Sequence, residues 1–171
     1  MNQLSIFNNY DKVNSDKKEN SVFELYIDGA SRNNPGLSGA GVYIKKNNKE
    51  LIKSGYYLGI KTCNQAEYLA LLLGLLLIKK YIKDQDRLEI RSDSLLLVKQ
   101  ILGEYKITNP VLKKLNNYIK NSLNDLNYDI YHILRDKNKI ADKLANQAID
   151  QKLNIEYNIK EEIKEKLDID I

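Results

Sequence analysis

The segment from Thr62 to Ile82 constrains the fold more than any other part of the chain. Leucine and alanine occupy nearly every side of this stretch through Leu77, and a helix that is apolar all round is normally buried. Asn64 is a candidate N-cap, and Glu67 follows three residues later, which is the spacing of a capping box. We therefore expect a long helix that is largely enclosed by the rest of the chain.

Three strands are predicted ahead of this helix, over residues 22–28, 39–46 and 49–58. In the first of them, apolar and polar side chains alternate, as they do when one face of a sheet is buried. Asn47 and Asn48 lie between the second and third strands and favour a tight turn. Together these segments predict an antiparallel meander.

The chain after the helix alternates between strands and helices. Strands are predicted over 88–92 and 128–134, and helices over 95–103, over 110–123 and from Asn138 to about Gln151. The element order is then βββ-α-β-α-α-β-α, and strands that are separated by helices usually pair in parallel. The simplest architecture is an α/β fold with a mixed five-stranded sheet and helices packed against it.

The length of 171 residues suits one domain with short extensions. The polar segment 1–21 predicts a flexible N-terminal arm, residues 22–152 form the predicted domain, and residues 153–171 predict a charged, amphipathic tail that contains a short helix. The longest apolar run, residues 69–78, is too short to span a bilayer, so no membrane partner is expected.

The net charge and the cysteine content bear on the expected partners and on the expected cellular compartment. The net charge of +4 is compatible with a polyanionic partner. Cys63 is the single cysteine and has no internal disulfide partner, which favours a reducing compartment, the cytoplasm. Nothing in the sequence calls for a protein partner, so a monomer is expected.

Four acidic residues stand at the ends of predicted elements. Asp28 and Asp93 end predicted strands, and Glu67 and Asp142 lie in the first turn of predicted helices. Each also has a purely structural interpretation, because acids are common in turns, at helix N-caps, in capping boxes and in first helical turns. In a layered α/β domain, however, such positions can converge at one edge of the sheet.

Converging carboxylates favour a metal site. Ionised carboxylates in one place repel each other strongly, and bound divalent cations remove that penalty. Hard oxygen ligands suit Mg²⁺ or Mn²⁺. Two such ions about 4 Å apart can stabilise both the attacking and the leaving oxygen of a phosphodiester. The four acids therefore favour metal-dependent phosphodiester chemistry.

The residues around these acids resemble the four sequence motifs of the type 1 ribonuclease H family. The match runs from about Val22 to Asp150 and is carried by Asp28-Gly29-Ala30, Asn34-Pro35-Gly36 with Gly39 and Gly41, Thr62–Leu71, Arg91–Ser94 and His132–Asn146. The last motif has the form His-x-x-Arg-x-x-Asn-x-x-Ala-Asp-x-Leu-Ala, which resembles a subgroup without a loop histidine. Four motifs in order, each with its acid, are far more specific than any one of them.

The resemblance implies the ribonuclease H fold and hydrolysis of the RNA strand of RNA/DNA hybrids, with 5′-phosphate and 3′-hydroxyl products. It implies that Asp28 bridges two Mg²⁺ ions, with Mn²⁺ as a possible substitute. Asp142 would hold the ion that activates water. Glu67 and Asp93 would hold the ion at the leaving oxygen.

Substrate contacts are also implied by the resemblance. Asn34 and Asn64 would contact 2′-hydroxyl groups, which distinguish RNA from DNA, and Thr62 would contact a phosphate of the DNA strand. Helix capping is the competing interpretation of Thr62 and Asn64. Cys63 stands where an asparagine is frequent in the family, and the link between Leu134 and Asp142 lacks the histidine that some members carry.

Three other functions fit the same fold. The domain could bind nucleic acid without cleaving it, or it could cleave only when joined to a partner such as a reverse transcriptase. It could also be a nuclease for another duplex. Loss of an acid would mark the non-catalytic form, and all four acids are present.

Overall fold

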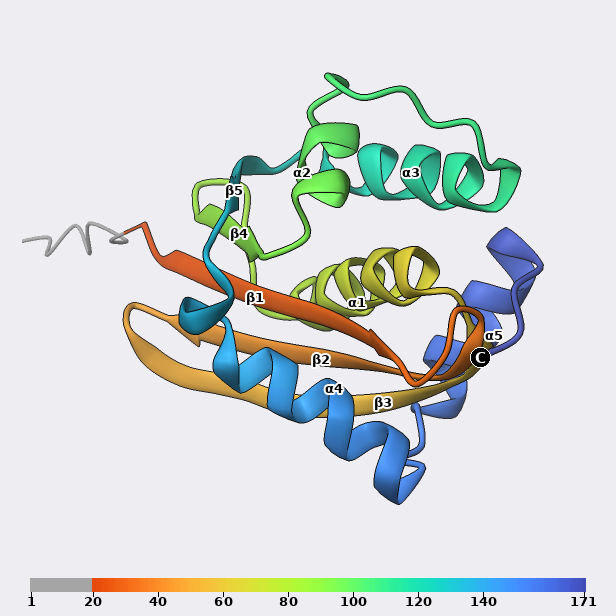
Figure 1. The fold of residues 1–171 in the computed structure, drawn as a ribbon. Coiled ribbons are helices and arrows are strands. Elements are labelled where there is room, and N and C mark those ends of the chain that lie inside the picture. The colour runs from red at the N-terminus through yellow and green to blue at the C-terminus, as the bar shows by residue number, and fades with distance from the viewer. Residues whose placement is uncertain (1–19) are drawn as a thin grey trace, which may run out of the picture.

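The computed structural model describes residues 20–171 and contains one mixed sheet with helices on both faces (Figure 1). Its strands are β1 (Val22–Ser31), β2 (Gly36–Lys46), β3 (Lys49–Lys61), β4 (Arg87–Ser92) and β5 (Asn127–His132). Its helices are α1 (Cys63–Ile78), α2 (Leu95–Ile101), α3 (Pro110–Leu123), α4 (Lys139–Gln151) and α5 (Tyr157–Leu167), with a 3-10 turn, η1, over Arg135–Lys137.

The strands are ordered β3-β2-β1-β4-β5 across the sheet. β1 pairs antiparallel with β2, and β2 pairs antiparallel with β3. The turn between β2 and β3 is made by Asn47 and Asn48, which both have positive φ. β1, β4 and β5 pair in parallel, because helices connect them. The predicted α/β fold with a mixed five-stranded sheet is confirmed.

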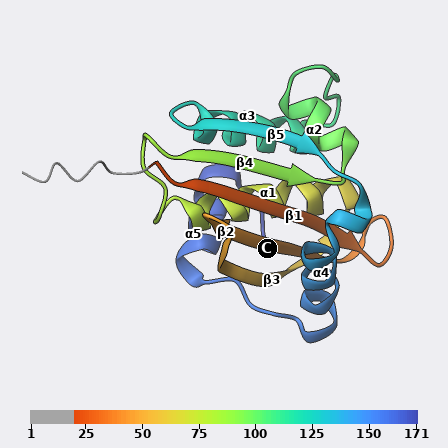
Figure 2. The ribbon, with the colours of Figure 1, turned by 90° about the vertical axis from the view of Figure 1, so that its left-hand side faces the viewer.

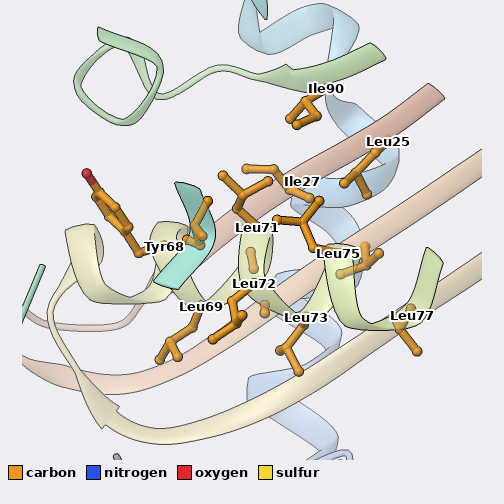
Figure 3. Packing of buried hydrophobic residues seen from close by; sticks show 14 of the residues in the cluster. Leu25, Ile27, Tyr68, Leu69, Leu71, Leu72, Leu73, Leu75, Leu77 and Ile90 are labelled. Atoms are coloured by element: carbon orange, nitrogen blue, oxygen red, sulfur yellow. The ribbon is translucent and has the colours of Figure 1, made fainter. Parts of the chain in front are cut away.

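Helix α1 is enclosed, as its sequence predicts. Figure 3 shows the leucines of α1 packed against Leu25, Ile27 and Ile90 of the sheet. These three sheet residues are fully buried. On the side of α1 that faces the other helices, the Tyr68 hydroxyl donates to Gln100 Oε1 of α2 at 2.9 Å. Each fully buried leucine contributes roughly 2 kcal/mol of apolar stabilisation, so α1 is the centre of the core.

Helix α4 packs on the opposite face of the sheet from α1, across β1, β2 and β3 (Figure 2). In the same view no helix crosses the front of β4 and β5 within residues 20–171. One face of the sheet is therefore only partly covered.

The start and end of α1 differ from the prediction. Its N-cap is Thr62, whose hydroxyl accepts from the Gln65 N–H at 3.2 Å while the Gln65 side chain accepts from the Thr62 N–H at 2.9 Å. The capping box is therefore Thr62 with Gln65 and does not involve Asn64 or Glu67. Glu67 lies in the second turn as a consequence, and the helix ends at Ile78.

β1 is also longer than predicted, and this changes the setting of Asp28. The strand continues to Ser31 because β2 pairs with it that far. Its parallel pairing with β4 ends earlier, at Ile27 opposite Ser92. Asp28 is therefore the first residue of β1 beyond the end of β4, at an edge that is open on that side.

The predictions for the two ends of the chain compare differently with the structure. Most of the predicted arm, residues 1–19, lies outside the described residues, whereas Ser21 is buried and its N–H donates to Asp86 Oδ1 at 2.9 Å. The predicted boundary at residue 152 does not separate a tail from the core. α5 buries Ile159, Ile163 and Leu167 in the same cluster as the sheet. Among residues 20–171, no helix has the length and hydrophobicity needed to cross a bilayer.

Candidate active site

The structure brings the four predicted acids to one open cleft of roughly 350 Å³. Asp28 comes from β1, Glu67 from α1, Asp93 from the residue after β4, and Asp142 from α4. Asp28, Glu67 and Asp93 each offer a carboxylate oxygen, and these oxygens lie within 4.8 Å of one another. Asp142 lines the same cleft outside this close group.

Gly29 allows Glu67 to reach Asp28. A Cβ atom at Gly29 would lie 2.1 Å from the backbone nitrogen of Glu67, so β1 and α1 touch here through their main chains. A larger residue at this position would push α1 away from the sheet, because real Cβ atoms do not approach backbone this closely. The glycine after the first acid therefore sets the distance to the second.

Asp93 is held by Asn138, a residue that the sequence marks only as part of a motif and as the start of a helix. The Asn138 side chain is 1% exposed. Its Nδ2 donates to the Ile27 carbonyl at 2.8 Å and to Asp93 Oδ1 at 3.0 Å. An asparagine before a helix normally caps it, but this side chain makes no cap bond and instead ties β1 to Asp93.

Asn138→Ala is expected to lower turnover about 10- to 100-fold, by analogy with other residues that orient metal ligands. Alanine would leave the buried Ile27 carbonyl unpaired and Asp93 free to turn. The measurement is the Mg²⁺ dependence of cleavage, which should shift to higher Mg²⁺. Asn116→Ala is the matched control, because Asn116 is also a buried asparagine that donates across elements, to the Tyr68 hydroxyl and the Gln100 carbonyl, but it does not line the acidic cleft. An unchanged Mg²⁺ requirement in the Asn138 variant would show that Asp93 needs no support.

Asp142 is positioned by α4 and paired at the mouth of the cleft. Arg135 of η1 donates from Nη2 to Asp142 Oδ1 at 3.1 Å, and the Arg135 side chain is 80% exposed. α4 can lie this close to β2 because a Cβ atom at Gly41 would be 2.0 Å from the Ala141 carbonyl oxygen. The helix backbone therefore rests directly on the strand, one residue before Asp142.

Burial and the neighbouring acids raise the pKa values of Asp28 and Glu67. The pKa of Asp28 is raised to about 7, mainly by burial and in addition by the negative charges of Asp93 and Asp142. Burial also raises the pKa of Glu67 well above its ordinary range, with Asp28 and Asp93 adding to the effect and a hydrogen bond from the Gly29 backbone opposing it. In the absence of a cation the cleft therefore favours protonated acids.

Without a metal, Asp28→Asn is expected to stabilise the fold at about pH 8. The pKa of Asp28 rises from 3.8 to about 7 on folding, so the folded chain binds a proton that the unfolded chain has lost. Stability therefore falls as the pH rises through this window, and asparagine avoids this loss, on the order of 2 kcal/mol. Thermal melts in EDTA should show the gain at about pH 8 and none near pH 3. A lower melting temperature for the variant at about pH 8 would contradict the assignment.

These residues fit a divalent cation. Glu67 Oε2 is buried and has no hydrogen-bond partner among the described residues, which is costly for a carboxylate unless a cation balances it. The raised pKa values report the same unbalanced charge. Carboxylates alone are the donor set that suits a hard cation such as Mg²⁺ or Mn²⁺.

The predicted substrate-binding residues surround the start of α1. Asn34 Oδ1 accepts from the Cys63 N–H at 3.0 Å, so Asn34 ties the β1–β2 loop to the helix. Thr62 caps the helix and Asn64 is exposed. All three line a second cleft of roughly 410 Å³ together with Lys106, Thr108 and Asn109. Asn64 also lines the acidic cleft and so lies between the two.

The sequence matches a family model described as reverse transcriptase-like over residues 26–148. Ribonuclease HI of Halobacterium salinarum is 35% identical to this chain over 119 residues, which is 68% of the chain. The chain belongs to the ribonuclease H family. It spans 59% of the length of that curated relative.

Solved ribonuclease H structures share the fold. Ribonuclease H1 from Halobacterium salinarum superposes with a TM-score of 0.72 at 33% identity, covering 76% of this chain and 98% of that one. The ribonuclease H1 named LC11, solved in complex with an RNA/DNA hybrid, gives a TM-score of 0.71 at 37% identity, covering 77% and 99%. In the present ribonuclease H chain, the one histidine, His132, is exposed at the end of β5 and is not among the residues that line the acidic cleft.

Proposed function

We propose that this ribonuclease H chain is a metal-dependent endonuclease that hydrolyses the RNA strand of RNA/DNA hybrids and leaves 5′-phosphate and 3′-hydroxyl ends. The observation that carries the proposal is the group of three carboxylates within 4.8 Å of one another in an open cleft. The hybrid complex of LC11 ribonuclease H1, at 37% identity, supports the choice of substrate.

Asp28, Glu67, Asp93 and Asp142 would hold two Mg²⁺ ions, or Mn²⁺ in their place. When bound, such ions lower the pKa of water and stabilise the charge on a leaving oxygen. The chain itself fixes the ligands. Gly29 sets Glu67 against Asp28, and Asn138 holds Asp93 through a bond of 3.0 Å. Arg135 adds a positive charge at the mouth of the cleft, where the phosphodiester would enter.

The residues around the start of α1 would position the duplex. The Thr62 hydroxyl accepts a bond within its own helix cap, and its hydrogen remains available to donate to a phosphate. Asn34 likewise uses Oδ1 for the Cys63 N–H and keeps Nδ2 for a 2′-hydroxyl. Capping and substrate contact are therefore compatible in these side chains. Lys106 in the same cleft supplies positive charge for the DNA strand.

The test uses one hybrid duplex with matched all-RNA and all-DNA duplexes, incubated with Mg²⁺, with Mn²⁺ or with EDTA. Cuts that require metal and are confined to the RNA strand of the hybrid are the expected result. End analysis should find 5′-phosphate and 3′-hydroxyl groups. Binding without cutting under both metals would overturn the proposal in favour of a non-catalytic or partner-dependent domain. Cutting of the other duplexes would overturn the choice of substrate.

A cytoplasmic location and a monomeric working form are also part of the proposal. The single cysteine supports a reducing compartment. One hydrophobic cluster runs from β1 to α5 within one chain, which supports a monomer.

A further inference from the structure

The partly covered face of the sheet carries a row of planar side chains. Tyr131 of β5 is paired with Arg91 of β4, Arg91 with Tyr26 of β1, and Tyr26 with Tyr43 of β2. Paired residues in a sheet point to the same side, so these four form one row, called here the aromatic row. Figure 2 shows the front of β5 and β4, where the row begins, without a covering helix.

The middle of the row is held in place by neighbouring charges. The Tyr26 and Tyr43 ring centroids lie 5.8 Å apart, and the Arg91 guanidinium lies 5.1 Å from the centre of the Tyr26 ring. Glu24 and Glu89 both accept hydrogen bonds from Arg91 and so fix its plane. Lys45 also pairs with Glu24, at 3.2 Å, and Asp129, which points to the same face, pairs with Arg87 at 2.8 Å. Glu24, Glu89 and Asp129 therefore each have a basic partner.

A positively charged cleft adjoins the row at Tyr26 and Tyr43. It has a volume of roughly 360 Å³ and lies between these tyrosines and the first turn of α4. Three lysines, Lys45, Lys137 and Lys139, line it against one acid, Asp136. α4 begins there without a side-chain cap, so the positive end of its dipole adds to the lysines.

We propose that the aromatic row and this cleft bind single-stranded nucleic acid, with unpaired bases stacked on Tyr43, Tyr131 and Arg91 and a phosphate beside Lys139. Single strands are commonly bound by aromatic side chains on which bases stack, next to a basic groove that follows the backbone. A duplex keeps its base faces stacked inside, so it cannot use such a row. The row selects unpaired strands for that reason.

The binding site is separate from the cleavage site but close to it. The two clefts share no lining residue. Tyr26 and Asp28 lie two residues apart on the same face of β1, which is about 7 Å along a strand. A single strand that extends beyond a hybrid could therefore reach the row from the acidic cleft.

The experiment measures fluorescence anisotropy of a labelled single-stranded DNA of about 15 nucleotides, a length that suits stacking sites of this size, in EDTA with the full chain. Wild type should bind saturably. Tyr131→Ala should weaken binding about 5- to 20-fold, because one stacking contact is lost. Tyr43→Leu tests the second position with an apolar side chain that preserves packing. Both variants should cleave a blunt hybrid at the wild-type rate.

Tyr81→Ala is the matched control, because Tyr81 is as exposed as Tyr131, 42% against 40%, and lies between α1 and β4. It should bind the single strand like wild type. The proposal is overturned if wild type does not bind, if the Tyr131 and Tyr43 variants bind as Tyr81→Ala does, or if binding is lost in Thr62→Ala instead. Asp28→Asn should still bind the single strand, so failure of the cleavage proposal would be seen separately.

Discussion

Asp28→Asn will abolish hybrid cleavage while the hybrid is still bound within a few fold of wild-type affinity. Asp28 belongs to the close group of three carboxylates and is the first residue of β1 beyond its pairing with β4. Loss of a central metal ligand removes several kcal/mol of transition-state stabilisation, which is about a 1,000-fold fall in turnover or more. The measurement is single-turnover cleavage in Mg²⁺ beside anisotropy of the intact hybrid in Ca²⁺.

Asp150→Asn is the control for this substitution. Asp150 is an exposed acid at the far end of α4 that pairs with Arg32 at 2.5 Å and does not line the acidic cleft. Its variant should cleave at the wild-type rate. Wild-type turnover in the Asp28 variant would refute the metal assignment, whereas loss of hybrid binding would mean that Asp28 also supports the substrate groove.

Gly41→Ala should both destabilise the fold and lower activity. The new Cβ atom would lie 2.0 Å from the Ala141 carbonyl oxygen and 2.8 Å from the Ala145 nitrogen. Both are backbone atoms of α4, so the helix must move as a unit. We expect a loss of about 3 kcal/mol, at the upper end for overpacking, and at least a tenfold fall in turnover because Asp142 moves with Ala141. Denaturant unfolding and cleavage rates measure the two effects.

Gly103→Ala is the control for Gly41→Ala. Gly103 has φ +80°, but a Cβ atom there would meet nothing closer than Lys120 Nζ at 3.7 Å. The control should lose only about 1 kcal/mol through backbone strain and keep its activity. If Gly41→Ala matched this control in both stability and turnover, α4 would not be the element that fixes Asp142.

Much of the fold could be predicted because its signals are local. The continuous apolar run of α1, the alternation in β1 and the asparagine turn between β2 and β3 depend on neighbouring residues only. Local signals also compete. Thr62 and Asn64 are both good caps, and the choice of Thr62 depends on Gln65 standing at the right distance. The extension of β1 past Asp28 depends on its pairing with β2, and the local sequence of β1 does not reveal that pairing.

The convergence of the four acids in one cleft could be predicted from the sequence, whereas the residues that hold them in place were harder to predict. The four acids are recognisable from their residue type and from the motifs around them. Asn138, by contrast, is held by a hydrogen bond to the carbonyl of Ile27, 111 residues away in the sequence. No local pattern predicts such a bond. The core role of α5, by contrast, could have been found, because Ile159, Ile163 and Leu167 repeat every four residues along one helical face.

The docking of α4 against β2 has a consequence for biosynthesis. The central strand β1 is made early, yet it must wait for β4 to pair with it and for α4 to deliver the fourth acid. A chain emerging from the ribosome therefore carries Asp28, Glu67 and Asp93 long before it carries Asp142. Because single domains generally fold as units, the nascent chain remains without a complete acidic cleft until residues beyond Gln151 have emerged. The proposed nuclease activity therefore requires that α4 has emerged and packed against β2.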